Sequence, residues 1–128
     1  ATYVQALRIK GAEDDMEQFY RYWKGRGAEV IIQKYDYFAG FLPQKRAGDI
    51  SPLIRQPCWH LQRDMVVLLD GTVPLCKEDI SQTQVLGNVF SEDLAAIWQR
   101  AQGRYIEHSQ REYSGICKDC DEYYTFNF

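Results

Sequence analysis

Residues 58–76 read CWHLQRDMVVLLDGTVPLC, with a cysteine at each end and an Asp-Gly pair between two apolar runs. An Asp-Gly pair in this setting is typical of a tight hairpin turn, because both positions accept a positive φ. We therefore predict a β-hairpin whose two short strands are residues 63–69 and 72–76. A hairpin folds back on itself, so it would bring Cys58, just before it, close to Cys76, at its end.

Two further cysteines lie near the C-terminus in a Cys-x-x-Cys knuckle, Cys117-Lys118-Asp119-Cys120. A knuckle of this kind directs two thiolates at one metal from a tight turn, and its backbone N–H groups can donate to sulfur. Two ligands from the hairpin and two from the knuckle predict a closed four-thiolate metal site. Four thiolates suit tetrahedral zinc and a 4Fe–4S cluster equally well. The predicted ligands are Cys58, Cys76, Cys117 and Cys120.

Other interpretations of the four cysteines stay open at this point. The Cys-x-x-Cys pair could be a redox dithiol, although that motif normally opens a helix that follows a strand. The four could be unrelated buried thiols, or structural disulfides, which are rare in compartments that keep thiols reduced. A zinc site more often pairs two Cys-x-x-Cys knuckles, whereas seventeen residues separate Cys58 from Cys76. This spacing lowers the expectation of zinc without removing it.

The N-terminal part of the chain has the pattern of a βαβ unit. Residues 2–9 and 28–35 are rich in β-branched and apolar residues, which favours strands. Between them, residues 14–24 carry apolar side chains at helical spacing after an acidic start, which predicts an amphipathic helix. Strands joined by such a helix are expected to be parallel. One unit cannot cover its own faces, so we expect it to be the last part of a larger (β/α) barrel.

The rest of the chain is predicted to contain a linker, a turn and a second helix. Residues 37–56 hold several glycines and prolines and few regularly spaced apolar residues, which predicts a linker. Leu86-Gly87-Asn88-Val89 predicts a turn, and Ser91 predicts the N-cap of a helix that runs to about His108, its cationic end. The aromatic tail, expected to pack against the metal-binding domain or the barrel, contains Tyr123, Tyr124, Phe126 and Phe128.

These elements together predict an α+β fold in three parts. Residues 1–36 are expected to be the terminal βαβ unit of a partial (β/α) barrel, and residues 37–56 the linker. Residues 57–128 are expected to form a small metal-binding domain built from a β-hairpin and a helix. The function is expected to reside in this last part, because it contains all four cysteines.

Charge and hydropathy exclude two classes of partner. The 128 residues carry a net charge of −3, and the basic residues are scattered along the chain. A nucleic-acid-binding protein normally shows a basic patch or stripe, so we expect no nucleic acid partner. No apolar run approaches the roughly 20 residues that cross a bilayer, and the first residues lack the pattern of a signal peptide. We therefore expect no membrane association and a cytoplasmic location.

Between residues 55 and 124 the chain carries a series of cysteine, glycine, acidic and aromatic positions in a defined order. They are Cys58, Gly71, Cys76, Asp79, the Leu86-Gly87-Asn88 segment, Trp98, Cys117 and Cys120. This order resembles the SPASM and related Twitch domains, the C-terminal auxiliary-cluster domains of radical S-adenosylmethionine (radical SAM) enzymes. Full SPASM domains continue with several more cysteines and hold two auxiliary clusters, whereas Asp121-Glu122-Tyr123-Tyr124 follows here. The resemblance therefore implies a shortened domain with one 4Fe–4S cluster on the four cysteines, although zinc could occupy the isolated domain.

The resemblance also implies what surrounds this domain. The Cys-x-x-x-Cys-x-x-Cys loop that binds the catalytic cluster and S-adenosylmethionine is not among the 128 residues. Cleavage of S-adenosylmethionine would thus belong to an N-terminal radical SAM barrel of the same protein, and no catalytic residue is assigned here. The parent would be an oxidoreductase or a peptide- or protein-modifying enzyme, and the cluster would support electron transfer or substrate binding. The expected partners are that barrel, a peptide or protein substrate, and an electron donor or acceptor.

Several side chains beside the cysteines have a structural and a functional interpretation. Trp59 could shield the cluster, but core packing is favoured. His60 could replace a cysteine as a ligand, but the four thiolates complete the site, so a hydrogen bond or a surface position is expected. Arg63 and Lys77 are expected to be solvated. The main alternatives to the cluster domain are a zinc-stabilised interaction module and a thiol redox protein that uses Cys117 and Cys120.

Overall fold

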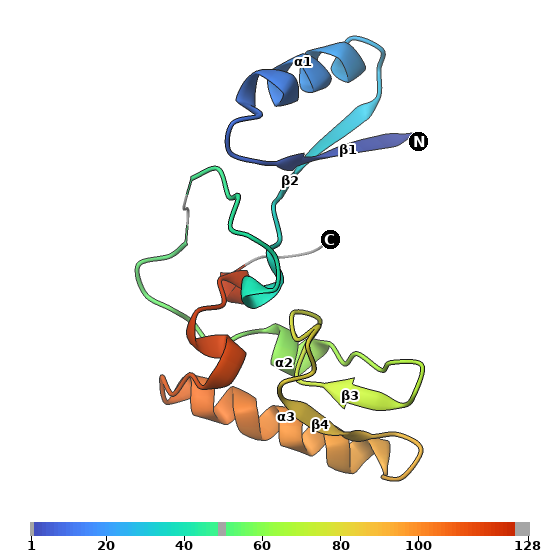
Figure 1. The fold of residues 1–128 in the computed structure, drawn as a ribbon, viewed down its shortest axis with the longest axis vertical. Coiled ribbons are helices and arrows are strands. Elements are labelled where there is room, and N and C mark those ends of the chain that lie inside the picture. The colour runs from blue at the N-terminus through green and yellow to red at the C-terminus, as the bar shows by residue number, and fades with distance from the viewer. Residues whose placement is uncertain (1, 49–50, 125–128) are drawn as a thin grey trace. The chain divides into compact units, whose positions relative to one another are not determined.

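The computed structural model describes residues 2–48 and 51–124, in which helices and small sheets alternate along the chain (Figure 1). Within these residues the chain divides into two units. Residues 2–37 and 43–48 form the first unit, and residues 38–42 and 51–124 form the second. The described helices and strands agree with a mixed α and β fold. None of the helices in the described part of the chain is long and apolar enough to span a membrane.

The first unit is a βαβ motif formed by β1 (Tyr3–Arg8), α1 (Glu13–Lys24) and β2 (Glu29–Lys34). The two strands are parallel and pair over all six residues of each, which confirms the prediction from sequence. Three acidic residues occupy the first turn of α1, where they meet the positive end of the helix dipole. After α1 the chain reverses through Gly27 at a φ of 76°, a conformation that glycine adopts without steric cost.

The two-stranded sheet of the first unit leaves large apolar side chains exposed, namely Tyr3, Leu7, Ile31 and Ile32. Part of the predicted linker pairs with the end of β1: Ile9 forms an antiparallel bridge with Arg46, and the Lys10 N–H donates to the Lys45 carbonyl at 2.9 Å. The larger barrel to which this unit would belong stays a prediction.

The second unit contains one antiparallel strand pair, one long helix and several short helices. The long helix is α3, and the order along the chain is η1 (Phe38–Gly40), α2 (His60–Arg63), β3 (Thr72–Pro74), β4 (Val85–Asn88), α3 (Leu94–Ser109), η2 (Gly115–Lys118) and η3 (Glu122–Tyr124). β3 pairs with β4 through an irregular register, and α3 packs against α2 and β4.

The predicted hairpin of residues 63–69 and 72–76 is wrong in its strand partner. The turn itself forms, since Gly71 has a φ of 80° and the Leu68 N–H donates to the Thr72 carbonyl at 2.9 Å. Residues 64–68, however, are not in a strand. The partner of β3 is β4, which lies further along the chain. A local turn motif does not predict a pairing of this kind.

The predicted turn at Leu86-Gly87-Asn88-Val89 is also wrong, because most of it belongs to β4. A Cβ atom at Gly87 would lie 3.0 Å from Ile97 Cγ1 and 2.7 Å from the Arg100 guanidinium. The glycine is therefore required by the close approach of β4 to α3. The predicted N-cap at Ser91 is wrong as well, since α3 begins after Asp93 and has no side-chain cap.

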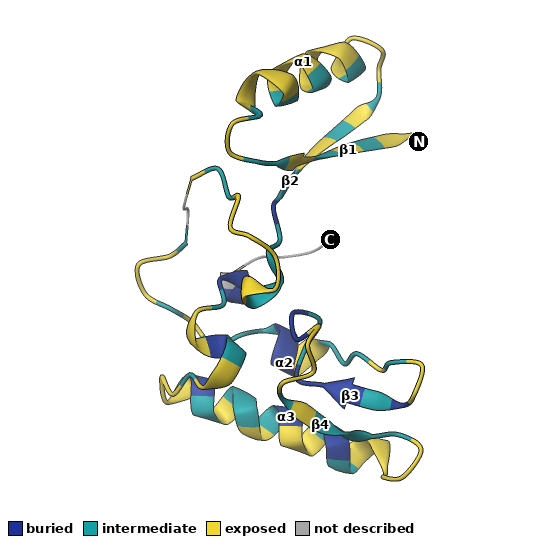
Figure 2. Cartoon of the chain, viewed as in Figure 1, coloured by how far each residue is buried: buried dark blue, intermediate teal, exposed yellow. Residues whose placement is uncertain are grey.

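The core of the second unit lies between α3, α2 and β3 (Figure 2). Its most deeply buried apolar side chains are Leu61, Val73, Leu75, Ile97 and Ala101. Burying a leucine, isoleucine or valine side chain contributes about 1.5–3 kcal/mol. Leu61 and Leu75 also pack against Cys117 in one cluster, so the hydrophobic core and the cysteine region are continuous.

Candidate metal centre

Separate segments of the second unit bring the four cysteines to one cavity. Cys58 lies two residues before α2, Cys76 follows β3, Cys117 lies in η2 and Cys120 comes just after it. All four line a cavity of about 20 Å³. The structure therefore brings together the complete set of predicted ligands. All four are free thiols, so the disulfide interpretation is wrong.

The four sulfurs surround the cavity instead of meeting at one point. Among the residues that the structure describes, no three of these sulfurs lie within 4.8 Å of one another. A single tetrahedral zinc ion, with bonds of about 2.3 Å to each thiolate, needs sulfurs only about 3.8 Å apart. As placed, the sulfurs are too far apart to share one such ion.

Cys58 is fixed by the turn that starts α2. The backbone N–H groups of His60 and Leu61 are directed at its sulfur. The Leu61 N–H also donates to the Cys58 carbonyl at 3.3 Å, and the Cys58 N–H donates to Nδ1 of His108 at 3.3 Å. Hydrogen bonds to sulfur favour the thiolate, which is the form that binds a metal.

Cys76 is fixed by a loop that the Asp79 carboxylate closes. This carboxylate is 2% exposed and accepts hydrogen bonds from the N–H groups of Thr83 and Gln84, each at 2.8 Å, and from the Thr83 hydroxyl at 2.9 Å. The Glu78 N–H is directed at the Cys76 sulfur. The loop thus places both the thiol and a backbone donor to it.

The knuckle cysteines lie in and after η2. The Cys117 N–H donates to the Ser114 carbonyl at 3.2 Å, and the Glu122 N–H donates to the Cys120 sulfur at 3.4 Å. The Cys120 sulfur therefore accepts a hydrogen bond from the backbone two residues further along the chain, and the backbone N–H groups of His60 and Glu78 lower the pKa of Cys58 and Cys76 against the larger effect of burial. N–H···S bonds of this kind are one means by which proteins set the reduction potential of iron–sulfur clusters.

Burial raises the pKa of all four thiols. The pKa of Cys117 rises to about 11 and that of Cys120 to about 12, and burial also raises the pKa of Cys58 and Cys76. At neutral pH the thiols are therefore protonated until a bound metal displaces the protons. A reactive dithiol needs a lowered thiol pKa, so the raised pKa values of Cys117 and Cys120 do not favour a redox dithiol.

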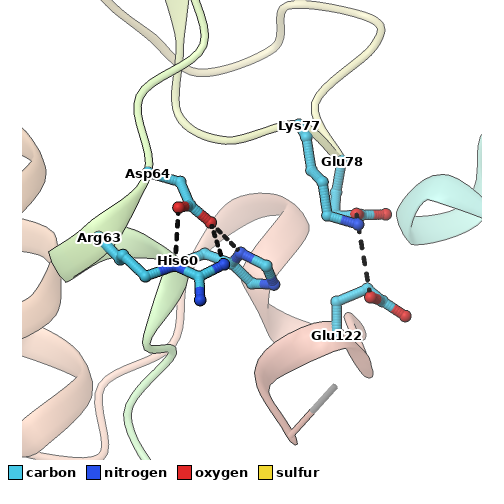
Figure 3. A network of polar contacts seen from close by, with 6 residues as sticks. All are labelled: His60, Arg63, Asp64, Lys77, Glu78 and Glu122. Atoms are coloured by element: carbon cyan, nitrogen blue, oxygen red, sulfur yellow. Dashed lines mark hydrogen bonds and ion pairs between the residues drawn. The ribbon is translucent and has the colours of Figure 1, made fainter. Parts of the chain in front are cut away.

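His60 contributes to a polar network beside the cavity that it lines (Figure 3). It is 4% exposed, and its Nδ1 lies 2.7 Å from the Asp64 carboxylate, to which Arg63 also donates at 2.9 Å. Trp59 is half-buried, stacks on the His60 ring with centroids 4.0 Å apart, and lies under the Arg63 guanidinium. The predicted hydrogen bond of His60 is confirmed, and Arg63 is exposed as predicted.

Lys77 joins the segments that follow two of the cysteines (Figure 3). Its ammonium group lies 2.8 Å from the Glu78 carboxylate and 3.6 Å from the Glu122 carboxylate. Glu78 comes two residues after Cys76, and Glu122 comes two residues after Cys120. The prediction of a solvated lysine is therefore wrong, because the side chain is partly buried and links the two segments.

His108 has a role that the sequence prediction missed. The prediction of a cationic helix end is wrong, because burial and the nearby Arg55 charge lower the pKa of His108 to about 4. The neutral ring accepts the Cys58 N–H at Nδ1 and packs against Tyr113 with centroids 4.8 Å apart. His108 lies seven residues after the buried Ala101 of the same helix, so the helical periodicity could have indicated its burial.

Comparison with known families identifies the class of protein. Residues 58–121 match the model of SPASM, described as an iron-sulfur cluster-binding domain. The match spans half of the chain, and the chain therefore belongs to the SPASM family, which confirms the resemblance found in the sequence. Residues 58–121 are thus an iron–sulfur cluster-binding domain.

The chain is also similar to a longer protein. An uncharacterized protein of Treponema pallidum (strain Nichols) is 52% identical over 124 residues. These residues cover 97% of this chain and 34% of the relative, so the chain spans about a third of the relative's length. No solved structure matches the chain.

Proposed function

We propose that the second unit binds one 4Fe–4S cluster that acts as the auxiliary cluster of a radical SAM protein. The proposed ligands are Cys58, Cys76, Cys117 and Cys120. One observation carries the proposal: these four side chains, from separate segments of a SPASM domain, line a single cavity.

The donor set and its surroundings fit such a cluster. Four thiols are the usual ligands of 4Fe–4S clusters. The Cys120 sulfur already accepts a backbone N–H group, that of Glu122 at 3.4 Å. Two buried nitrogen atoms of cavity-lining residues, Arg55 Nε and His60 Nε2, have no hydrogen-bond partner within the described residues. A sulfur-rich group in the cavity would give such nitrogens a partner.

When bound, the cluster supplies one-electron transfer. The chain holds the Cys120 sulfur through the N–H group of Glu122, and it keeps Cys58 in place through His108. Leu61 and Leu75 pack against Cys117 and Cys58 and shield that side of the cavity. Since all four ligands come from the chain, we expect electron transfer to or from a substrate radical or the catalytic cluster, not direct ligation of a substrate.

The proposed partners lie outside these 128 residues. They are a radical SAM barrel of the same protein, which would bind S-adenosylmethionine, a peptide or protein substrate, and an electron donor or acceptor. The length of the relative, of which this chain spans about a third, supports a larger parent protein. We expect the larger parent protein to form 5′-deoxyadenosine from S-adenosylmethionine. We expect no 5′-deoxyadenosine when only these 128 residues are supplied. Cleavage of S-adenosylmethionine by neither would contradict the radical SAM assignment.

The ligand assignment is tested with the full chain purified and reconstituted without oxygen. About four iron and four sulfide per chain are expected, with a broad visible absorption band. Replacement of each cysteine in turn by serine (Cys58→Ser, Cys76→Ser, Cys117→Ser, Cys120→Ser) should lower the iron content and change the spectrum, whereas Ser109→Ala on the exposed end of α3 should change neither. Bound zinc and no iron after reconstitution would refute the proposal.

A further inference from the structure

Arg55 is a cation beside the cysteines that no sequence motif marks out. Its side chain lines the same cavity as the four cysteines. One terminal nitrogen donates to the Lys118 carbonyl at 3.1 Å, and the other donates to the Cys117 carbonyl. Two arms of the guanidinium thus hold the backbone of the knuckle, over more than sixty residues of intervening sequence.

Two aromatic rings fix the position of this guanidinium. Its central carbon lies 4.0 Å from the centroid of the Tyr113 ring and 4.7 Å from that of the Tyr123 ring. A planar guanidinium can stack on such rings and donate several hydrogen bonds at once, which a lysine ammonium group cannot reproduce. The charge is therefore held at a fixed place beside the knuckle.

The third donor of Arg55 is buried and unused. Within the described part of the chain, its Nε has no hydrogen-bond partner. A buried donor on a charged group normally has an acceptor. Arg55 thus places a positive charge and an unused donor beside the cysteines.

We propose that Arg55 is a positioning residue that holds the knuckle and raises the reduction potential of the bound cluster, with its Nε–H donating to a cluster or thiolate sulfur. The proposal rests on the proposed function. Reduction transfers one electron from a reductant to a site that four thiolates already make negative, and no bond forms or breaks. A fixed cation nearby favours the more negative, reduced state.

The test is a redox titration of the reconstituted full chain with dithionite and mediators, followed by electron paramagnetic resonance. Arg55→Met removes the charge at similar length, Arg55→Gln removes it but keeps an amide donor, and Arg55→Lys keeps the charge. Arg100→Met is the matched control, since the partners of Arg100 are the Leu86 carbonyl and Glu92. Iron and sulfide are measured on every sample.

We expect the neutral Arg55 variants to lower the equilibrium constant for reduction at least tenfold, which is 59 mV for a one-electron couple. Arg55→Lys and Arg100→Met should change it less. Loss of iron from the neutral variants alone, with circular dichroism unchanged and iron retained in Arg55→Lys, would also support the assignment. A change below twofold in the neutral variants, or an equal fall of the equilibrium constant for reduction in Arg55→Lys and Arg55→Met, would overturn it. Absence of a cluster from the unmodified chain would instead overturn the proposed function, and this inference with it.

Discussion

Replacement of Asp79 by alanine should destabilise the second unit and release Cys76. The Asp79 carboxylate is buried and accepts three hydrogen bonds from Thr83 and Gln84. A hydrogen bond to a charged acceptor contributes about 1.5–3 kcal/mol, and a neutral one about 0.5–1.5 kcal/mol. Thr83 is exposed, so water can replace much of the hydrogen bonding that Thr83 loses. The N–H of the half-buried Gln84 loses its partner without such a replacement. The expected loss of unfolding free energy is about 3 kcal/mol.

The assay is urea unfolding of the metal-free chain, followed by tryptophan fluorescence in a Trp23→Phe background. The remaining signal then comes from Trp59 and Trp98 of the second unit. Asp70→Ala is the matched control, because Asp70 also accepts a backbone N–H, from Thr72 at 3.0 Å, but is exposed. Asp79→Ala should cost clearly more than Asp70→Ala and should also lower the iron content after reconstitution. Equal costs, or a cost below about 1 kcal/mol for Asp79→Ala, would refute the reasoning.

Three further predictions concern the packing and charge of the second unit. Ile97→Ala should cost about 2–5 kcal/mol in urea unfolding, because this side chain is fully buried and its removal leaves a cavity; a cost below about 1 kcal/mol would contradict the core assignment. Gly87→Ala should destabilise the second unit by about 1–3 kcal/mol, since the new methyl group meets Ile97. Gly103→Ala, on the open face of α3, should instead stabilise it by about 0.5–1 kcal/mol. The opposite order of the two unfolding midpoints would be evidence against the close contact of β4 with α3. The hydrogen bond from Arg100 lowers the pKa of Glu92. The stabilising effect of this bond is therefore present above the unfolded pKa of about 4.3 and is lost as the pH falls through the lower folded pKa. The stability difference between the unmodified chain and Glu92→Gln should shrink between about pH 5 and pH 3, and a constant difference would contradict this.

Local periodicity and turn chemistry allowed much of the secondary structure to be predicted. The βαβ unit followed from two apolar runs around the helix Glu13–Lys24, and the parallel pairing followed from that order. The long helix Leu94–Ser109 was also indicated by its apolar spacing. These signals lie within one element or between neighbours in the sequence, so a single sequence contains them.

Long-range pairing explains the failures in the fold. The turn at Asp70-Gly71 was predicted correctly, but the partner of β3 lies beyond the Asp79 loop, in β4. Gly87 indicated a turn because glycine is common in turns, whereas its actual role is to let β4 approach Ile97. The structural role of a glycine depends on the residues that pack against it, and a local sequence pattern does not contain that information.

The convergence of the four cysteines was predictable from the sequence, but the surroundings of the candidate site were not. The predicted hairpin and the Cys-x-x-Cys knuckle indicated that Cys58, Cys76, Cys117 and Cys120 would meet. The four line one cavity, although the strand partner in that prediction was wrong. The neutral, buried His108 and the guanidinium of Arg55 were missed. Both act on cysteines that lie about fifty or sixty residues away along the chain, and only the folded structure brings them together.

The most direct test of the central claim is iron K-edge X-ray absorption of the full chain after anaerobic reconstitution. If the four cysteines hold one 4Fe–4S cluster, the first shell of iron should contain sulfur only, and the second shell should contain iron. The signals of both shells should be lost in the double variant Cys76→Ser/Cys117→Ser. Iron without iron neighbours, or a first shell that contains nitrogen or oxygen in the unmodified chain, would contradict the claim.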